Sequence, residues 1–254
     1  MTLYVTFISA IQKRKLPESI EKLRKQVSFE WEEGVLKELT ASDALASAIE
    51  HNHVSYVDYL LREYKMDALH MQERCCSHLI LAVKWNRHLA LETILFHMTK
   101  WDSKTTINNN RGSHLKTAVH VSCELRRYEC LKMLISYGAN SNTRDIMGNT
   151  PLEYCLFGSN EQCHVNICNK CVQLIVNSIS HIDISIKERF DKLKGERPND
   201  NYLSVIELPP MPARLTQLCR CTIRTSLGLQ GRLPYNIQLL PLPPLLLSYV
   251  SLES

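Results

Sequence analysis

The chain has 254 residues, of which 44% are hydrophobic and 22% charged, a composition that excludes a disordered protein and predicts one large or two small domains. A net charge of +4, with basic residues that do not gather into one long stripe, argues against a nucleic-acid partner. No apolar run approaches eighteen residues, so we expect no membrane partner. Ten cysteines are too few for a disulfide scaffold and predict reduced thiols in an intracellular protein, cytosolic or nuclear.

The first forty residues contain two apolar segments separated by positive charge. Residues 1–11 are apolar, but Lys13-Arg14-Lys15 follows them and no small-residue cleavage site is evident, so a secretory signal peptide is not expected. Residues 16–40 place apolar side chains among charged ones, which predicts an amphipathic helix; these are Ile20, Leu23, Val27, Trp31, Leu36 and Leu39. We therefore expect residues 1–41 to form a helical cap on the segment that follows.

A pattern repeats through the middle of the chain. Thr117-Ala118-Val119-His120 and Thr150-Pro151-Leu152-Glu153 stand 33 residues apart. Each threonine is expected to cap a helix, with Pro151 at the first helical position, and Gly138 to end the preceding helix in a left-handed conformation. Residues 145–148 are expected to form the turn into the next repeat. The buried stripe of the helix before Gly138 comprises Leu131, Leu134 and Ile135.

Two weaker copies precede this pair. Leu45, Ala48, Val57, Leu60 and Leu61 recur 34 residues later as Leu79, Ala82, Leu91, Ile94 and Leu95. A polar insertion is expected around residues 101–111, and a late second helix in the fourth copy with Val172, Ile175 and Val176. The pattern resembles the ankyrin repeat. This resemblance implies a solenoid over residues 42–186, with repeats at 42–74, 76–110, 115–147 and 148–181.

Two further segments invite a functional interpretation. Cys163-His164-x-x-x-Cys168-x-x-Cys171, with the more distant His181, has partial zinc-site spacing. A single Cys-x-x-Cys pair is a weak signal, and a cysteine-rich insertion explains it more simply, so we expect no metal and no cofactor. Cys75-Cys76 is interpreted as packing, and His120 as structural. Glycine-rich phosphate loops and hydrolase motifs are absent from the sequence, so no enzymatic activity is expected. Residues 187–208, charged and broken by Gly195 and Pro198, are expected to form a connector.

The last forty-five residues have an apolar surface that they cannot bury alone. Leu215, Cys219 and Ile223 are spaced i, i+4 and i+8, which predicts one stripe along a helix. Residues 239–249 are an apolar run interrupted by three prolines, which cannot pair as a central strand. A short helix followed by such a segment needs a partner surface.

Residues 209–254 resemble a SOCS box. The resemblance implies an Elongin-binding half with Leu215, Leu218, Cys219 and Ile223, and a cullin-binding half with Ile237, Leu240, Pro241, Leu242, Pro243 and Leu246. It also implies Elongin B, Elongin C and a cullin of type 5 with its RING-finger subunit as partners.

Together these features predict an all-α protein: an ankyrin-repeat solenoid followed by a three-helix SOCS box. It is similar to the ankyrin repeat and SOCS box family, whose members are implied to be non-catalytic substrate receptors of ubiquitin ligases. The client surface is expected at the turn tips and first helices, at Arg111, His114, Glu124, Arg144, Asp145, Met147, Asn149 and Glu153. Two alternatives stay open: a scaffold or inhibitor whose box binds Elongins only for stability, and a zinc-dependent nucleic-acid binder built on Cys163, Cys168 and Cys171.

Overall fold

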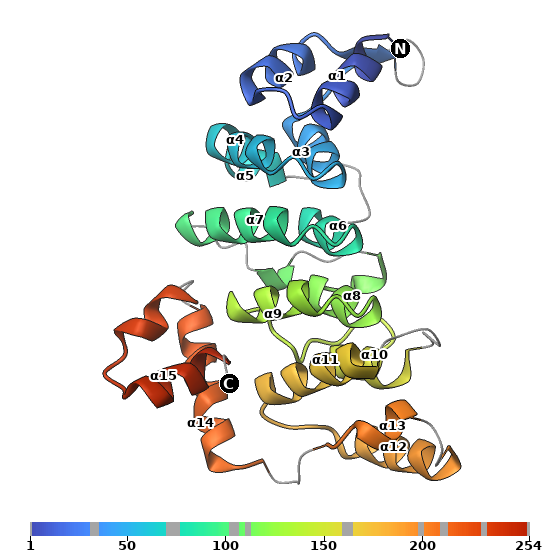
Figure 1. Cartoon of the computed structure of the whole chain (residues 1–254), viewed down its shortest axis with the longest axis vertical. Helices are drawn as coiled ribbons and strands as arrows, with labels where there is room; N and C mark the ends of the chain where they lie inside the picture. Colours follow the sequence, from blue (N-terminus) through green and yellow to red (C-terminus); the bar gives the residue numbers. More distant parts are fainter. Residues whose placement is uncertain are drawn as a thin grey trace. The chain divides into compact units, whose positions relative to one another are not determined.

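The computed structural model describes residues 2–30, 36–69, 77–101, 107–109, 113–158, 165–197, 201–208, 213–229 and 233–252. The chain forms two compact units, residues 1–104 and residues 105–254 (Figure 1). The division falls inside the polar insertion expected around residues 101–111. Among the described residues, no helix is long and apolar enough to cross a membrane.

Unit 1 is built from helix pairs and one small sheet. Its elements are α1 (Thr2–Gln12), α2 (Pro17–Arg24), β1 (Ser28–Glu30), β2 (Leu36–Glu38), α3 (Ala41–Glu50), α4 (Val54–Tyr64), α5 (Met66–Leu69), α6 (His78–Lys84) and α7 (His88–Lys100). Thr40 and Asp43 form a reciprocal capping box at the start of α3, and Ser77 caps α6. Every apolar residue expected to recur in the first two repeats is buried, which confirms the two weaker copies of the pattern.

The N-terminal segment differs from the expected cap. The helix expected over residues 16–40 ends at Arg24, and β1 and β2 follow as an antiparallel pair with Ser28 opposite Glu38. Trp31 lies outside the described residues. Residues 1–11 belong to α1, whose Phe7 and Ile11 are buried. The cap is therefore a helix pair, because two short apolar stripes pack against each other better than one long amphipathic helix would pack alone.

Unit 2 holds the remaining elements. These are η2 (Ile107–Asn109), η3 (Ser113–Leu115), α8 (Ala118–Glu124), α9 (Tyr128–Ser136), α10 (Pro151–Phe157), α11 (Val165–Ser178), α12 (Ile184–Glu196), α13 (Asn201–Val205), α14 (Leu215–Leu229), η4 (Tyr235–Leu239) and α15 (Pro244–Ser251). The third and fourth repeats follow the sequence expectation closely. Thr117 and Thr150 cap α8 and α10, with Pro151 in the first turn of α10. Gly138 is left-handed, with φ of 90°.

The expected connector over residues 187–208 is instead part of the packed structure. It contains most of α12 and all of α13, with Phe190, Leu203 and Ile206 buried. The charged residues that suggested a linker lie on the solvated side of α12, while Ile186 and Phe190, four residues apart, pack inward. The repeat array therefore ends with one more helix pair than the sequence pattern indicated.

Candidate functional site

Helix α14 has two faces of opposite chemistry. Leu215 is 75% exposed and Leu218 39% exposed, and Cys219 is also exposed. Arg220 and Arg224 are buried on the other face, at 4% and 8% exposure. Apolar side chains thus face solvent while two guanidinium groups face the protein, the reverse of the usual distribution.

The inward face of α14 is hydrogen-bonded to backbone carbonyls at the ends of α9 and α11. The amide of Gln217 donates to Val176 O and Ile179 O, at 2.9 Å each. Arg220 donates to Asn177 O at 2.7 Å. Carbonyls in the last turn of a helix have no partner within that helix, so these side chains satisfy groups that would otherwise be unpaired.

Arg224 is the most buried of these anchors in its environment. Its two terminal nitrogens donate to Ile135 O at 2.5 Å and to Val250 O at 3.0 Å, so it joins α9, α14 and α15. Burial, with Arg220 nearby, lowers the pKa of Arg224 to about 10, and the group stays charged at neutral pH. One side chain therefore ties both halves of the box to the third repeat.

The repeats and the box also approach closely at two glycines. A side chain at Gly138 would lie 3.3 Å from Leu233 Cδ1 and 3.4 Å from the Cα of Gly228. The same position needs a left-handed backbone. Gly138 was expected only to end a helix; it also leaves room for the box, and nothing in the repeat spacing could have revealed that second role.

The box has a small core of its own. Leu233, Ile237 and Val250 are buried, and Ile223, Leu227, Leu242 and Leu247 pack against them. Ile237, assigned by resemblance to the cullin-binding half, is only 1% exposed, so that assignment is corrected: its side chain closes the box core and has no free surface. Ile223 and Leu242 are half-buried in the same cluster, because a segment this short needs internal packing before it can present a surface.

The second half of the box nevertheless exposes apolar side chains. Pro241 and Pro243 are exposed, Leu240 is half-buried, and Leu246 is 46% exposed. The two most exposed leucines, Leu239 at 77% and Leu245 at 79%, were not among the residues expected to bind. The helical phase of α15 could have identified Leu245, because Leu247 and Val250 face inward, three residues apart.

The residues expected to bind a client do not form one uniform surface. Met147 is 76% exposed, and His114 and Arg144 are exposed. Glu124 pairs with Lys116 at 2.9 Å. Arg111 lies outside the described residues, and Asn149 is half-buried.

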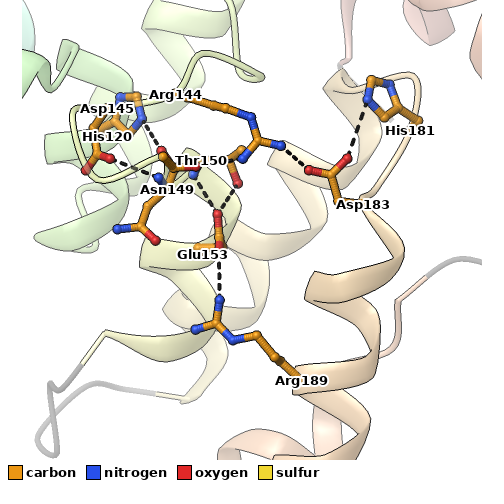
Figure 2. A network of polar contacts seen from close by, with 10 residues as sticks. His120, Arg144, Asp145, Asn149, Thr150, Glu153, His181, Asp183 and Arg189 are labelled. Atoms are coloured by element: carbon orange, nitrogen blue, oxygen red, sulfur yellow. Dashed lines mark hydrogen bonds and ion pairs between the residues drawn. The ribbon is translucent and has the colours of Figure 1, made fainter.

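Asp145 and Glu153 are part of an internal network, which corrects their expected role as surface residues (Figure 2). The Asp145 carboxylate accepts hydrogen bonds from the backbone N–H groups of Met147 and Asn149, both at 2.9 Å, and from the Tyr154 hydroxyl at 2.6 Å. Although burial by itself raises it, these hydrogen bonds lower the pKa of Asp145. Asp145 thus fixes the turn that carries Met147.

Glu153 connects the fourth repeat to α12. It accepts from the backbone N–H of Thr150 at 2.7 Å and pairs with Arg189 at 2.9 Å. Beside it, Arg144 pairs with Asp183, the residue that precedes α12 (Figure 2). His120 accepts or donates at Asn149 O at 3.2 Å, and burial lowers its pKa. The capping glutamate therefore stabilises the array.

The cysteine-rich segment is only partly described. Cys163, His164, Cys75 and Cys76 lie outside the described residues. Cys168 is disulfide-bonded, and Cys171 is a buried free thiol whose pKa is raised to about 12 by burial. In the ranges that the structure describes, no three histidine, cysteine or acidic side chains are grouped to hold a metal ion.

Comparison with known proteins agrees with this architecture. The SOCS box family model matches residues 211–251, and a model of ankyrin repeats in three copies matches residues 79–188. The second match runs into α12, in keeping with its packed position.

Three curated relatives share the repeats. The chain is 35% identical over 151 residues to ankyrin repeat domain-containing protein 9 of Mus musculus, covering 54% of this chain and 46% of that protein. It is 24% identical over 141 residues to the nuclear factor NF-kappa-B p110 subunit of Drosophila melanogaster, covering 54% and 13%. It is 34% identical over 62 residues to target of rapamycin complex 2 subunit AVO2 of Saccharomyces cerevisiae, covering 24% and 15%. The match thus spans less than half the length of each relative.

Proteins with ankyrin repeats and a SOCS box are typically non-catalytic adaptors, and this combination fits a substrate receptor of a cullin-RING ligase in general. The repeats, the box and their order along the chain agree between sequence, structure and family models. This chain is an ankyrin-repeat protein with a C-terminal SOCS box.

Proposed function

We propose that this chain is the substrate-recognition subunit of a cullin-RING ubiquitin-protein ligase. In this proposal α14 binds Elongin C, which is paired with Elongin B, and the second half of the box binds a type 5 cullin with its RING-finger subunit. The ankyrin repeats hold a client protein for ubiquitination and proteasomal degradation. The observation that carries the proposal is the outward apolar face of α14, formed by Leu215, Leu218 and Cys219.

The outward face is available without any rearrangement of the box. Gln217, Arg220 and Arg224 hold the opposite face against α9 and α11, so a partner can cover Leu215 and Leu218 while these bonds persist. Burial of a large apolar side chain contributes about 1.5–3 kcal/mol. Cys219 suits a tight pocket, because it is a small and polarizable apolar side chain.

The cullin-binding surface is proposed on the exposed residues of the second half. These are Pro241, Pro243, Leu245 and Leu246, with Leu240 at their edge. Two prolines fix the backbone there, so little conformational freedom is lost on binding. Ile237 is not included, since it is buried.

The client surface is proposed at the exposed tips of the third and fourth repeats. His114, Arg144 and Met147 are its described members, and Arg111 and Glu124 are kept from the sequence. The chain itself transfers nothing; it raises the effective concentration of the client's lysines near a charged ubiquitin-conjugating enzyme.

The test is co-expression of the full chain with Elongin B and Elongin C. Leu215→Asp with Cys219→Asp should abolish the complex, because two carboxylates would be buried without partners. The matched control is Leu245→Asp, which changes an equally exposed leucine in the other half of the box and should leave the Elongin complex intact. Failure of the unchanged chain to form the complex, or equal behaviour of the two variants, would contradict the proposal.

The cullin step is tested on the purified Elongin complex. Replacing residues 240–243 with alanines should weaken cullin capture while the Elongin complex persists. If cullin capture is absent even without this change, the chain fits a scaffold or inhibitor whose box binds Elongins only for stability.

A further inference from the structure

The net charge of the chain is concentrated in a short segment near its start. Residues 12–25 contain six basic and two acidic residues, a net charge of +4, which equals the net charge of the whole chain. The rest of the chain therefore balances its charges. This segment is the turn between α1 and α2 together with α2 itself, and neither the repeats nor the box explains it.

Folding separates one ion pair of this segment from the others. Arg24 and Glu21 pair at 2.7 Å, and Glu21 also accepts from the hydroxyl of Tyr56 at 3.0 Å. Glu21 is 3% exposed, so this pair belongs to the interior of unit 1. It holds α2 against α4 and contributes almost nothing to the outer surface.

The other basic residues of the segment remain at the surface. Lys13, Arg14 and Lys15 are exposed in the turn, and Lys22 and Lys25 are exposed on and just after α2. The one exposed acid among residues 12–25 is Glu18. Because α2 has eight residues, these five cations are distributed over about 12 Å of helix. Figure 1 shows α1 and α2 at the end of unit 1, with α3 and α4 on one side of the pair only.

An exposed leucine lies within this basic cluster. Leu16 is 70% exposed, directly between Lys15 and the first residue of α2. At the other end of α1, Leu3 and Val5 are 48% and 62% exposed. Basic side chains with apolar side chains between them are the composition of surfaces that adsorb to anionic membranes.

We propose that the α1–α2 pair adsorbs to an anionic lipid surface, with Lys13, Lys15 and Lys22 at the phosphate level and Leu16 in the interface. Four of the five exposed cations are lysines, which act as point charges and do not impose the planar geometry of arginine. A diffuse anionic surface needs nothing more. Residues 12–25 contain no aromatic side chain on which a nucleic-acid base could stack, and an exposed leucine adds nothing to phosphate binding in a duplex.

This proposal revises the sequence-based expectation of no membrane partner. That expectation rested on the absence of a spanning segment, and a spanning helix is indeed absent from the described residues. Adsorption needs only surface charge and a shallow apolar anchor.

The test is co-sedimentation of the full chain with vesicles of phosphatidylcholine alone and of phosphatidylcholine with phosphatidylserine. We expect binding to the anionic vesicles only, weakening as salt is added. The variant Lys13→Ser, Lys15→Ser, Lys22→Ser should bind roughly a hundredfold more weakly, about fivefold for each lysine. Leu16→Ser should weaken binding about tenfold.

Matched controls change other parts of the surface. Lys132→Ser, Lys187→Ser, Lys192→Ser removes the same charge from unit 2, and Ile184→Ser changes a side chain that is 69% exposed. Both should bind as the unchanged chain does. Equal binding to neutral vesicles, no binding to anionic ones, or a lysine variant no weaker than its control would overturn the proposal. Retention on polyglutamate or duplex RNA without vesicle binding would also overturn it and would assign the cluster to an acidic protein or a nucleic acid. Elongin and client are absent from this assay, so its result is independent of the proposed ligase role.

Discussion

The two faces of α14 differ in a way that separates internal from external contacts. The inward face is polar, with Arg220 and Arg224 buried and bonded to carbonyls of the repeats and the box. The outward face is apolar, and Leu215 is three-quarters exposed. In a helix that served only its own domain, the apolar side would be buried. The reversal indicates that internal docking uses backbone acceptors, which leaves the apolar side chains for another protein.

The same contrast occurs two residues apart in η4, and it gives the largest expected effect. Ile237 is 1% exposed and Leu239 is 77% exposed. Ile237→Ala should lower the free energy of unfolding by about 3 kcal/mol through the cavity it leaves, whereas Leu239→Ala should change it by less than about 0.5 kcal/mol. Urea denaturation of the full chain, with hydrogen exchange over residues 233–252, measures both. Similar losses for the two variants would show that the box core is not the one described.

A second pair of variants compares the two faces of α14 directly. Arg224→Met should cost about 2 kcal/mol, because two buried carbonyls lose their donors while the cost of burying a guanidinium is removed. Leu218→Met on the outward face should leave stability nearly unchanged. Thermal melts of the two variants decide the matter. If Arg224→Met is as stable as the unchanged chain, the box is not anchored through that side chain.

Much of this arrangement could be predicted from the sequence where a period exists. The 33-residue spacing of Thr117 and Thr150 located two repeats, and each expected stripe residue in them is buried. The helix pairs at α1–α2 and α12–α13 were not predicted as repeat-like units, since neither has the threonine and glycine signals that mark a repeat. Their burial comes from apolar residues spaced at four, which the surrounding charge obscured.

The candidate site was predictable to a lesser degree. The stripe of α14 follows from its helical spacing, and Leu215 and Cys219 are exposed. In the proline-rich half no single period applies, so the sequence could not tell that Ile237 faces inward and Leu245 outward. Asp145 and Glu153 are polar residues near a turn, a description that fits surface and structural roles equally. Only the geometry of the hydrogen bonds separates these roles.

The turn that carries Met147 gives the smallest and most specific expected effect. Hydrogen bonds lower the pKa of Asp145 in the folded chain, so the unfolded chain binds this proton at the higher pH. Asp145 should therefore stabilise the fold above the ordinary aspartate pKa of about 3.9, and that contribution should disappear as the pH falls through the lower, folded value. Asp145→Asn should cost about 1 kcal/mol at neutral pH, and the deficit should shrink below about pH 4.

Thermal melts of the full chain at a series of pH values measure that deficit, with Asp191→Asn as the control at an exposed aspartate. The control should track the unchanged chain at every pH. A deficit for Asp145→Asn that persists undiminished in acid would mean that the carboxylate charge is irrelevant and that only the shape of the side chain holds the turn. In that case Met147 would be positioned by the backbone conformation of the turn, in which Gly148 has a φ of 82°, and the carboxylate would be dispensable for the proposed client surface.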